Sequence, residues 1–174
     1  MDLGPALAGW EHGHALPSST ATWDGTRMEK DFAAWRALNG AHSRILSAFD
    51  SRLVQVAGLS SGEFEILKHL KQAGGRLRMS HLADLVYTSR SGLTRRIDRL
   101  GNRGFVERES AAEDGRGQNA VLLQAGNEMY EQCLPAQRQL LLDWFGRSLD
   151  QDELAALTNL LTKLIESESA VQVG

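Results

Sequence analysis

The chain has 174 residues, one cysteine and no long apolar stretch, and both scarcities exclude classes of protein. With Cys133 alone, no disulfide can form within the chain, which fits a reducing compartment. No run approaches the roughly 18 apolar residues of a membrane span. A basic segment followed by an apolar one is missing near the start, so we expect no signal peptide, no membrane partner and a cytoplasmic location.

Motifs typical of common catalytic sites are missing as well. The sequence contains no glycine-rich phosphate-binding motif, no Gly-x-Ser-x-Gly and no His-Glu-x-x-His. His12 and His14 have a two-residue spacing, which is a weak metal-binding pattern. We therefore predict that the protein is not an enzyme, we expect no cofactor, and we assign no metal ligand. A metal-responsive (zinc) repressor remains an alternative, which metal content after purification would test.

The positive charge of the chain is concentrated in one segment. Residues 88–108 hold six arginines and two acidic residues, a balance of +4, whereas the whole chain has a net charge of −3. Such a local basic segment in an acidic protein is typical of a nucleic-acid-binding surface. The overall composition, 42% hydrophobic and 24% charged, fits one domain with a single core.

The same segment contains an ordered series of predicted elements. These are a helix, a turn, a second helix and two strands, over residues 80–87, 88–89, 90–100, 105–108 and 120–123. Gly101 and Gly104 end the second helix, and a charged loop closing at Gly117 separates the strands. Helix, turn, helix and β-hairpin in this order predict a winged helix-turn-helix, whose second helix enters the DNA major groove.

The second helix of this motif has two distinct faces. Leu93, Ile97 and Leu100 share the side that must be buried. The opposite side carries small residues and arginines, and arginine can bind guanine edges in a bidentate manner or bind phosphate. We predict DNA contacts from this helix and from the wing by Ser89, Arg90, Ser91, Thr94, Arg95, Arg99, Arg116 and Gln118.

Longer helices are predicted on both sides of the winged region, which covers about residues 60–123. Apolar residues recur at helical spacing over residues 28–57 and again over 124–167. Ser-x-x-Glu and Asp-x-x-Glu capping boxes begin the helices after Ser60 and Asp150. Pro135 removes a backbone hydrogen bond, so we expect a kink near residues 131–135.

The predicted fold class is therefore mainly α with a small β-hairpin (α+β). Leu140, Leu141, Trp144 and Phe145, with the leucines of residues 154–164, exceed what a small winged core needs. We expect the N- and C-terminal helices to form a dimerisation subdomain, within a single domain over residues 28–167. Residues 1–27 are rich in glycine, proline and serine, and we predict a flexible N-terminal extension there.

Several segments resemble the MarR-type transcriptional regulators. They are residues 59–67, 78–83, 89–100, 104–108 and 114–117 with 122–126, and the resemblance spans roughly residues 30–167. The recognition helix followed by the wing is the most specific part. One departure is Gly115, which stands where the wing of the family usually carries the first of two basic residues.

The resemblance implies a homodimeric repressor that binds a double-stranded inverted-repeat operator and leaves it when a small aromatic or anionic effector binds. In urate-responsive members, positions corresponding to Glu65, Arg96 and Arg108 carry charged or polar residues of the ligand site. Trp35 is a looser match to an aromatic residue on an early helix.

Ordinary roles for these four residues stay open. They are an ion pair between Glu65 and Arg96, a phosphate contact by Arg108, and a place in the core for Trp35. A protein-interaction module with a vestigial winged helix also remains an alternative, although the outward-facing Arg95 and Arg99 oppose it.

Overall fold

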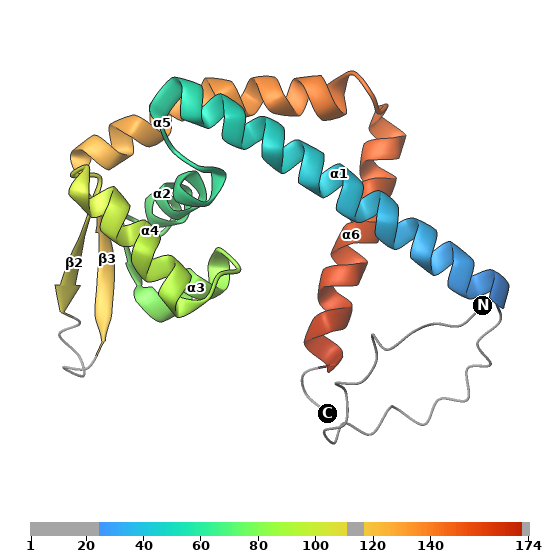
Figure 1. Ribbon diagram of the computed structural model, residues 1–174, viewed down its shortest axis with the longest axis horizontal. Coiled ribbons are helices and arrows are strands. Elements are labelled where there is room, and N and C mark those ends of the chain that lie inside the picture. Colours follow the sequence, from blue (N-terminus) through green and yellow to red (C-terminus); the bar gives the residue numbers. More distant parts are fainter. Residues whose placement is uncertain (1–24, 111–116, 172–174) are drawn as a thin grey trace, which may run out of the picture. The chain divides into compact units, whose positions relative to one another are not determined.

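The computed structural model describes residues 25–110 and 117–171 (Figure 1). These residues form six α-helices, one π-helix and three strands, with the bounds α1 Gly25–Ala57, α2 Ser61–Gln72, β1 Arg76–Arg78, α3 Met79–Leu85, α4 Arg90–Asn102, β2 Val106–Ser110, β3 Gln118–Leu122, α5 Gln124–Leu141, η1 Leu142–Gly146 and α6 Gln151–Val171. The fold is mainly helical with one small sheet, as the sequence predicts.

The three strands form an antiparallel sheet in the order β1-β3-β2. In the wing, β2 pairs with β3 so that Arg108 lies opposite Ala120. The short strand β1 pairs with the other edge of β3, with Leu77 opposite Ala120. This confirms the winged helix-turn-helix layout.

The core lies between α2, α3, α4, the sheet and the C-terminal part of α1. Its largest fully buried side chains include Phe64, Leu53 and Ile97. Phe64 packs edge-on against Phe49, with ring centroids 5.3 Å apart, and stacks on Tyr130 at 5.4 Å. Cys133 is also part of this core, where burial raises the pKa of its thiol although Arg103 opposes the shift.

Local sequence signals explain where several helices begin. At α2, the Ser60 hydroxyl accepts a hydrogen bond from the Glu63 N–H, and the Ser60 N–H donates to the Glu63 carboxylate, which completes the predicted capping box. The same reciprocal pair joins Asp150 and Glu153 at the start of α6. These side chains satisfy N–H groups that have no partner within the helix.

Other boundaries differ from those the sequence predicts. Helix α3 begins at Met79, and its N-cap residue, Arg78, makes no side-chain capping bond. Helix α1 begins at Gly25, three residues earlier than expected. Helix α5 continues through Pro135, its ribbon changes direction along its length, and a π-helix follows at Leu142–Gly146 (Figure 1). The helix that contains Pro135 is therefore followed directly by a short π-helix, which is wider than an α-helix.

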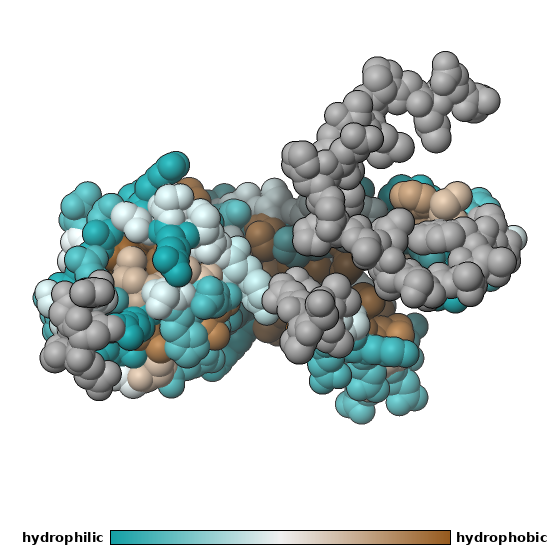
Figure 2. Space-filling view, turned by 90° about the horizontal axis from the view of Figure 1, so that it is seen from below, coloured by the Kyte–Doolittle hydropathy of each residue, from teal (hydrophilic) through white to brown (hydrophobic). Residues whose placement is uncertain are grey.

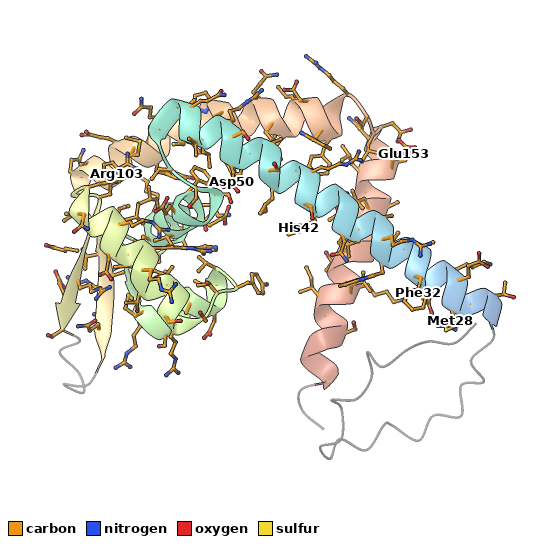
Figure 3. All side chains as sticks on the ribbon, in the orientation of Figure 1. Met28, Phe32, His42, Asp50, Arg103 and Glu153 are labelled. Atoms are coloured by element: carbon orange, nitrogen blue, oxygen red, sulfur yellow. The ribbon has the colours of Figure 1, made fainter. Side chains whose placement is uncertain are left out.

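The chain divides into two compact units, Met1–Asn39 and Gly40–Gly174. Within the first unit, Met28 and Phe32 are exposed on α1 (Figure 3), and Trp35 on the same helix is exposed as well. Within the second unit, α6 exposes Leu160, Leu164 and Ile165. Hydrophobic surface is accordingly visible as brown patches in the space-filling view (Figure 2). None of the helices described is long and apolar enough to cross a membrane.

Candidate nucleic-acid interface

The recognition helix α4 presents the two faces that its sequence predicts. Leu93, Ile97 and Leu100 are buried against the winged core. The opposite side carries Arg90, Ser91, Thr94 and Arg95, and all four are exposed. Arg95 takes part in no hydrogen bond or ion pair with another described residue, so its guanidinium is free to bind a ligand from solution.

Ser89 lies at the N-cap of α4 and has a structural role there. Its hydroxyl accepts a hydrogen bond from the Gly92 N–H at 3.1 Å, and it lies 3.2 Å from the Ser91 hydroxyl. The cap orients the first turn of the helix, where backbone N–H groups and the positive end of the helix dipole favour an anion such as phosphate.

A cleft of about 490 Å³ separates α4 from the base of the wing. Three predicted DNA contacts, Arg90, Thr94 and Gln118, line it together with Leu93 and the small residue Gly117. The sequence interpretation missed its other three lining residues, Arg78, Met79 and Ser80. The alternation of basic residues in Arg76-Leu77-Arg78 is the sequence signal that points to this part of the cleft.

Gly117 lies close to one of these missed residues. A Cβ atom placed on Gly117 would lie 2.6 Å from a guanidinium nitrogen of Arg78, so a larger residue there would displace the Arg78 side chain. Arg116, the predicted wing contact, belongs to residues 111–116 and lies outside the described residues. At the base of the wing, the described residues that line the cleft are therefore Gly117 and Gln118, and the Arg78 side chain lies beside Gly117.

Arg99 has a partner inside the protein that the sequence interpretation did not foresee. Its Nε donates to Glu63 Oε1 at 2.7 Å, although just over half of the Arg99 side chain is exposed. Burial alone would raise the pKa of Glu63. Hydrogen bonds from the Ser60 N–H, Arg99 and the Ser60 hydroxyl, with the positive charge of Arg99, outweigh it, and the pKa lies below its usual 4.5. The Glu63 carboxylate is therefore charged at neutral pH.

The residues expected at an effector site are held by different partners. Glu65 pairs with Lys68 and lies 3.7 Å from His69. Arg108 donates to Asp98 at 2.5 Å and to the Thr94 carbonyl at 3.1 Å. The expected Glu65–Arg96 ion pair is not among these contacts.

Arg96 and Trp35 have surroundings of their own. Arg96 packs beside Gly62 on α2, where a Cβ atom would lie 2.8 Å from its guanidinium carbon. Trp35 lines an apolar surface recess of about 370 Å³ with Met28, Asp31 and Phe32, and it is exposed rather than part of a core. The alternative of a place in the core for Trp35 is therefore contradicted by its exposure.

Possible metal ligands do not gather in the part of the chain that the structure describes. Within residues 25–110 and 117–171, no three His, Cys, Asp or Glu side chains are placed to hold one ion. His69 lies next to Glu65, and burial, followed by the charge of Lys68, lowers its pKa against the opposing effect of Glu65. His12 and His14 lie outside the described residues.

Comparison with known proteins identifies the family. The MarR family profile matches residues 57–117. AbsC, a MarR family transcriptional regulator from Streptomyces coelicolor, is 30% identical, with a TM-score of 0.74 over 81% of this chain and 95% of AbsC. Sco3205 from the same organism, solved with DNA, is 23% identical, with a TM-score of 0.75 over 90% and 92% of the two chains.

A curated relative agrees with these structures. The transcriptional repressor MprA of Escherichia coli K12 is 29% identical over 122 residues, which are 68% of this chain and 69% of MprA. The match covers the winged region, and AbsC extends the similarity over nearly its whole length. Members of this class are transcriptional regulators rather than enzymes. The chain belongs to the MarR family of transcriptional regulators.

Proposed function

We propose that the protein binds double-stranded DNA in a sequence-specific manner, with α4 in the major groove and the wing beside it. The observation that carries this proposal is the outward face of α4, where Arg90 and Arg95 are exposed beside small residues. Arginine reads guanine through paired hydrogen bonds, and the cleft lined by Arg90, Thr94 and Gln118 lies beside this face. Such a protein works at the chromosome, so we place it in the cytoplasm.

We further propose that it acts as a homodimer on an inverted repeat. The apolar residues of α6, Leu160, Leu164 and Ile165, are exposed in the single chain, as is the Trp35 face of α1. Burying such residues against a second copy is favourable by roughly 1.5–3 kcal/mol for each fully buried leucine. A two-fold dimer then requires inverted half-sites about one helical turn apart.

A repressor released by a small aromatic or anionic effector is the regulatory part of the proposal. MprA is named a transcriptional repressor. The DNA binding of BpsR from Bordetella bronchiseptica, which is 21% identical with a TM-score of 0.67, is regulated by 6-hydroxynicotinic acid. For this chain we retain Glu65, Arg96 and Arg108 as proposed effector contacts.

The test begins with selection of duplexes from a random library by the purified full chain, followed by sequencing. We expect an enriched inverted repeat, and no enrichment would contradict DNA binding. Aromatic carboxylates, phenols and urate are then titrated against the bound duplex, with Arg96→Ala and Arg108→Ala as comparison variants. If a compound releases DNA and both variants respond to it as the wild type does, the proposed effector residues are wrong.

A further inference from the structure

The arginines of α4 fall into two groups with different surroundings. Arg90 and Arg95 face solvent, whereas Arg96, Arg99 and Arg103 lie on one flank of the helix, because spacings of three and four residues repeat the same side. All three of this second group contact the segment where α1 ends and α2 begins. We call Arg96, Arg99 and Arg103 the anchoring arginines.

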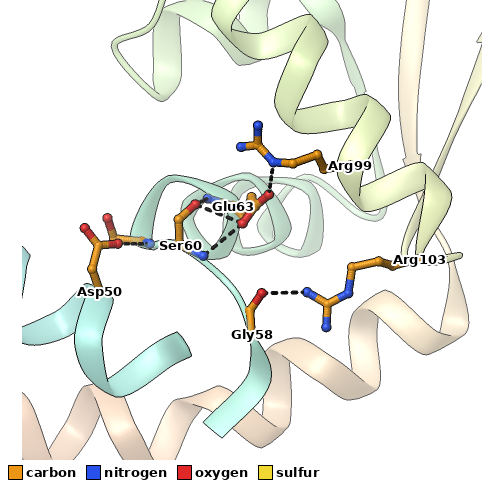
Figure 4. A network of polar contacts seen from close by, with 7 residues as sticks. Asp50, Gly58, Ser60, Glu63, Arg99 and Arg103 are labelled. Atoms are coloured by element: carbon orange, nitrogen blue, oxygen red, sulfur yellow. Dashed lines mark hydrogen bonds and ion pairs between the residues drawn. The ribbon is translucent and has the colours of Figure 1, made fainter. Parts of the chain in front are cut away.

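Arg103 makes the most direct of these contacts. Its Nη1 donates to the Gly58 carbonyl at 2.9 Å (Figure 4). Its Nη2 donates to the Ala57 carbonyl at 2.7 Å. Carbonyls at the end of a helix have no partner within the helix, and the helix dipole makes that end attractive for a cation. The guanidinium also lies 4.6 Å from the ring centroid of Phe105. Arg103 therefore joins the end of α4 to the end of α1.

The second contact joins α4 to the start of α2. Arg99 pairs with Glu63, and the same carboxylate caps α2 through Ser60. From the other side, Asp50 of α1 accepts a hydrogen bond from the Ser61 N–H at 2.5 Å (Figure 4). The junction between α1 and α2 is thus fixed by polar contacts from both α1 and α4.

A glycine makes room for the remaining anchoring arginine. At Gly62, one residue before Glu63, a Cβ atom would lie 2.8 Å from the Arg96 guanidinium carbon and 2.8 Å from its Nη1. Any larger residue at that position must displace the Arg96 side chain. Arg96 and Arg99 therefore place this flank of α4 against the start of α2, and Arg103 places it against the end of α1.

We infer that Arg103, supported by the Arg99–Glu63 pair, is a positioning residue that sets which separation of half-sites the dimer accepts. This inference rests on the proposed function, in which α1 contributes to the dimer and α4 enters the groove. The duplex fixes the distance between half-sites, so the recognition helix must keep one orientation relative to the end of α1. Arg103 holds that orientation without touching DNA.

The test compares duplexes that differ only in spacing. The inverted repeat selected by the wild type is prepared with its own spacing, with one or two base pairs added or removed, and as a single half-site. For the wild type we expect a loss of about tenfold or more on a one-base-pair change. For R103Q we expect half-site affinity within about twofold of the wild type, and spacing preference reduced to about threefold or less.

Two further variants make the result specific. R95Q is the matched control, because Arg95 is on the same helix but faces solvent. It should weaken binding to every duplex, the single half-site included, and keep the spacing preference. R103K, which retains the charge with a single donor group, should lie between R103Q and the wild type, and it replaces R103Q in the test if that variant does not fold.

The outcomes separate the inference from the proposed function. An R103Q protein with the spacing preference of the wild type, or one weakened equally on every duplex, would overturn the positioning role and leave the proposed function intact. A wild-type protein that selects no inverted repeat would overturn both. Flattened spacing preference with preserved half-site affinity is the result that supports the inference.

Discussion

The winged region and the terminal helices differ in how far their large apolar residues are exposed to solvent. In the winged region, Phe64 and Leu67 are fully buried by the chain's own elements. On the terminal helices, Trp35 is 60% exposed and Leu160 is 64% exposed, although both are as apolar as the core residues. The core of the winged region is therefore completed within one chain, with Leu53 of α1 and Cys133 of α5 as part of it, whereas other residues of α1 and α6 leave apolar surface suited to a second copy.

Charged substitutions on the apolar face of α6 are expected to have the largest effect. Leu160 and Leu164 are one helical turn apart and exposed, and we expect L160E/L164E to abolish dimerisation and operator binding together. Burying two carboxylates in an apolar interface costs several kcal/mol unless they are paired. Thr162 lies on the other side of α6, so T162E is the control and should remain dimeric. A dimeric L160E/L164E protein in sedimentation would place the interface elsewhere.

A pair of phenylalanines sharpens the same comparison. Phe64 is buried in the winged core and Phe32 is exposed on α1. In the monomeric L160E/L164E background, we expect F64A to lower the free energy of unfolding by about 3–5 kcal/mol, because it leaves a cavity in the core. F32A should change it by about 0.5 kcal/mol or less. Denaturant unfolding measures both, and similar values for the two would show that the division is wrong.

Within the winged region, Arg95 tests whether an exposed side chain acts in DNA contact alone. We expect R95A to weaken specific binding by about 1–3 kcal/mol, as expected for a lost base contact. The free energy of unfolding should stay within about 0.5 kcal/mol, because Arg95 packs against no core residue. R95K keeps the charge but loses the bidentate geometry, so it should bind more weakly than the wild type. Wild-type affinity in both variants would remove Arg95 from the interface.

Lowering the pH tests the network of polar contacts between Ser60, Glu63 and Arg99. The folded state lowers the pKa of Glu63 below 4.5. The stabilisation from this carboxylate is therefore fully present above that value, and it is lost as the pH falls through the lower, folded-state pKa. We expect unfolding measured from pH 7 to pH 3 to show a smaller decline for E63Q than for the wild type. Parallel curves for the two proteins would contradict the Ser60–Glu63–Arg99 network.

The smallest expected effect concerns a strained position of the winged region. Tyr87 lies in the turn between α3 and α4 with φ at +47°, a conformation that favours glycine. Its side chain is 88% exposed, so replacing it removes little packing. We expect Y87G to raise stability by up to about 1 kcal/mol, since relief of strain exceeds the entropy that glycine loses. A lower melting temperature would mean that the ring makes contacts of its own.

The sequence predicts local features of this molecule better than tertiary ones. The capping boxes at Ser60 and Asp150 and the buried face of α4 follow from spacing alone, because each depends on residues three or four apart. The partners of Arg99 and Arg103 do not, because they are 36 and 45 residues away in the chain. An exposed arginine facing DNA and one facing a distant carbonyl have the same local pattern.

The same limit applies to the helix boundaries and to the effector residues. Met79 begins α3 without a side-chain cap, so no local signal marks that start. The π-helix at Leu142–Gly146 likewise has no distinct residue pattern. The family resemblance predicts Glu65, Arg96 and Arg108 as effector residues, and each has a different partner in the structure, which spacing does not reveal.

Footprinting of the wild-type protein on its selected duplex tests the central claim most directly. The claim is that two copies, held by their terminal helices, each place one α4 in the major groove. The predicted result is two protected segments, related by a two-fold axis and about one helical turn apart, with both lost together in L160E/L164E. A single protected segment, or two segments that persist in the L160E/L164E protein, would contradict the account.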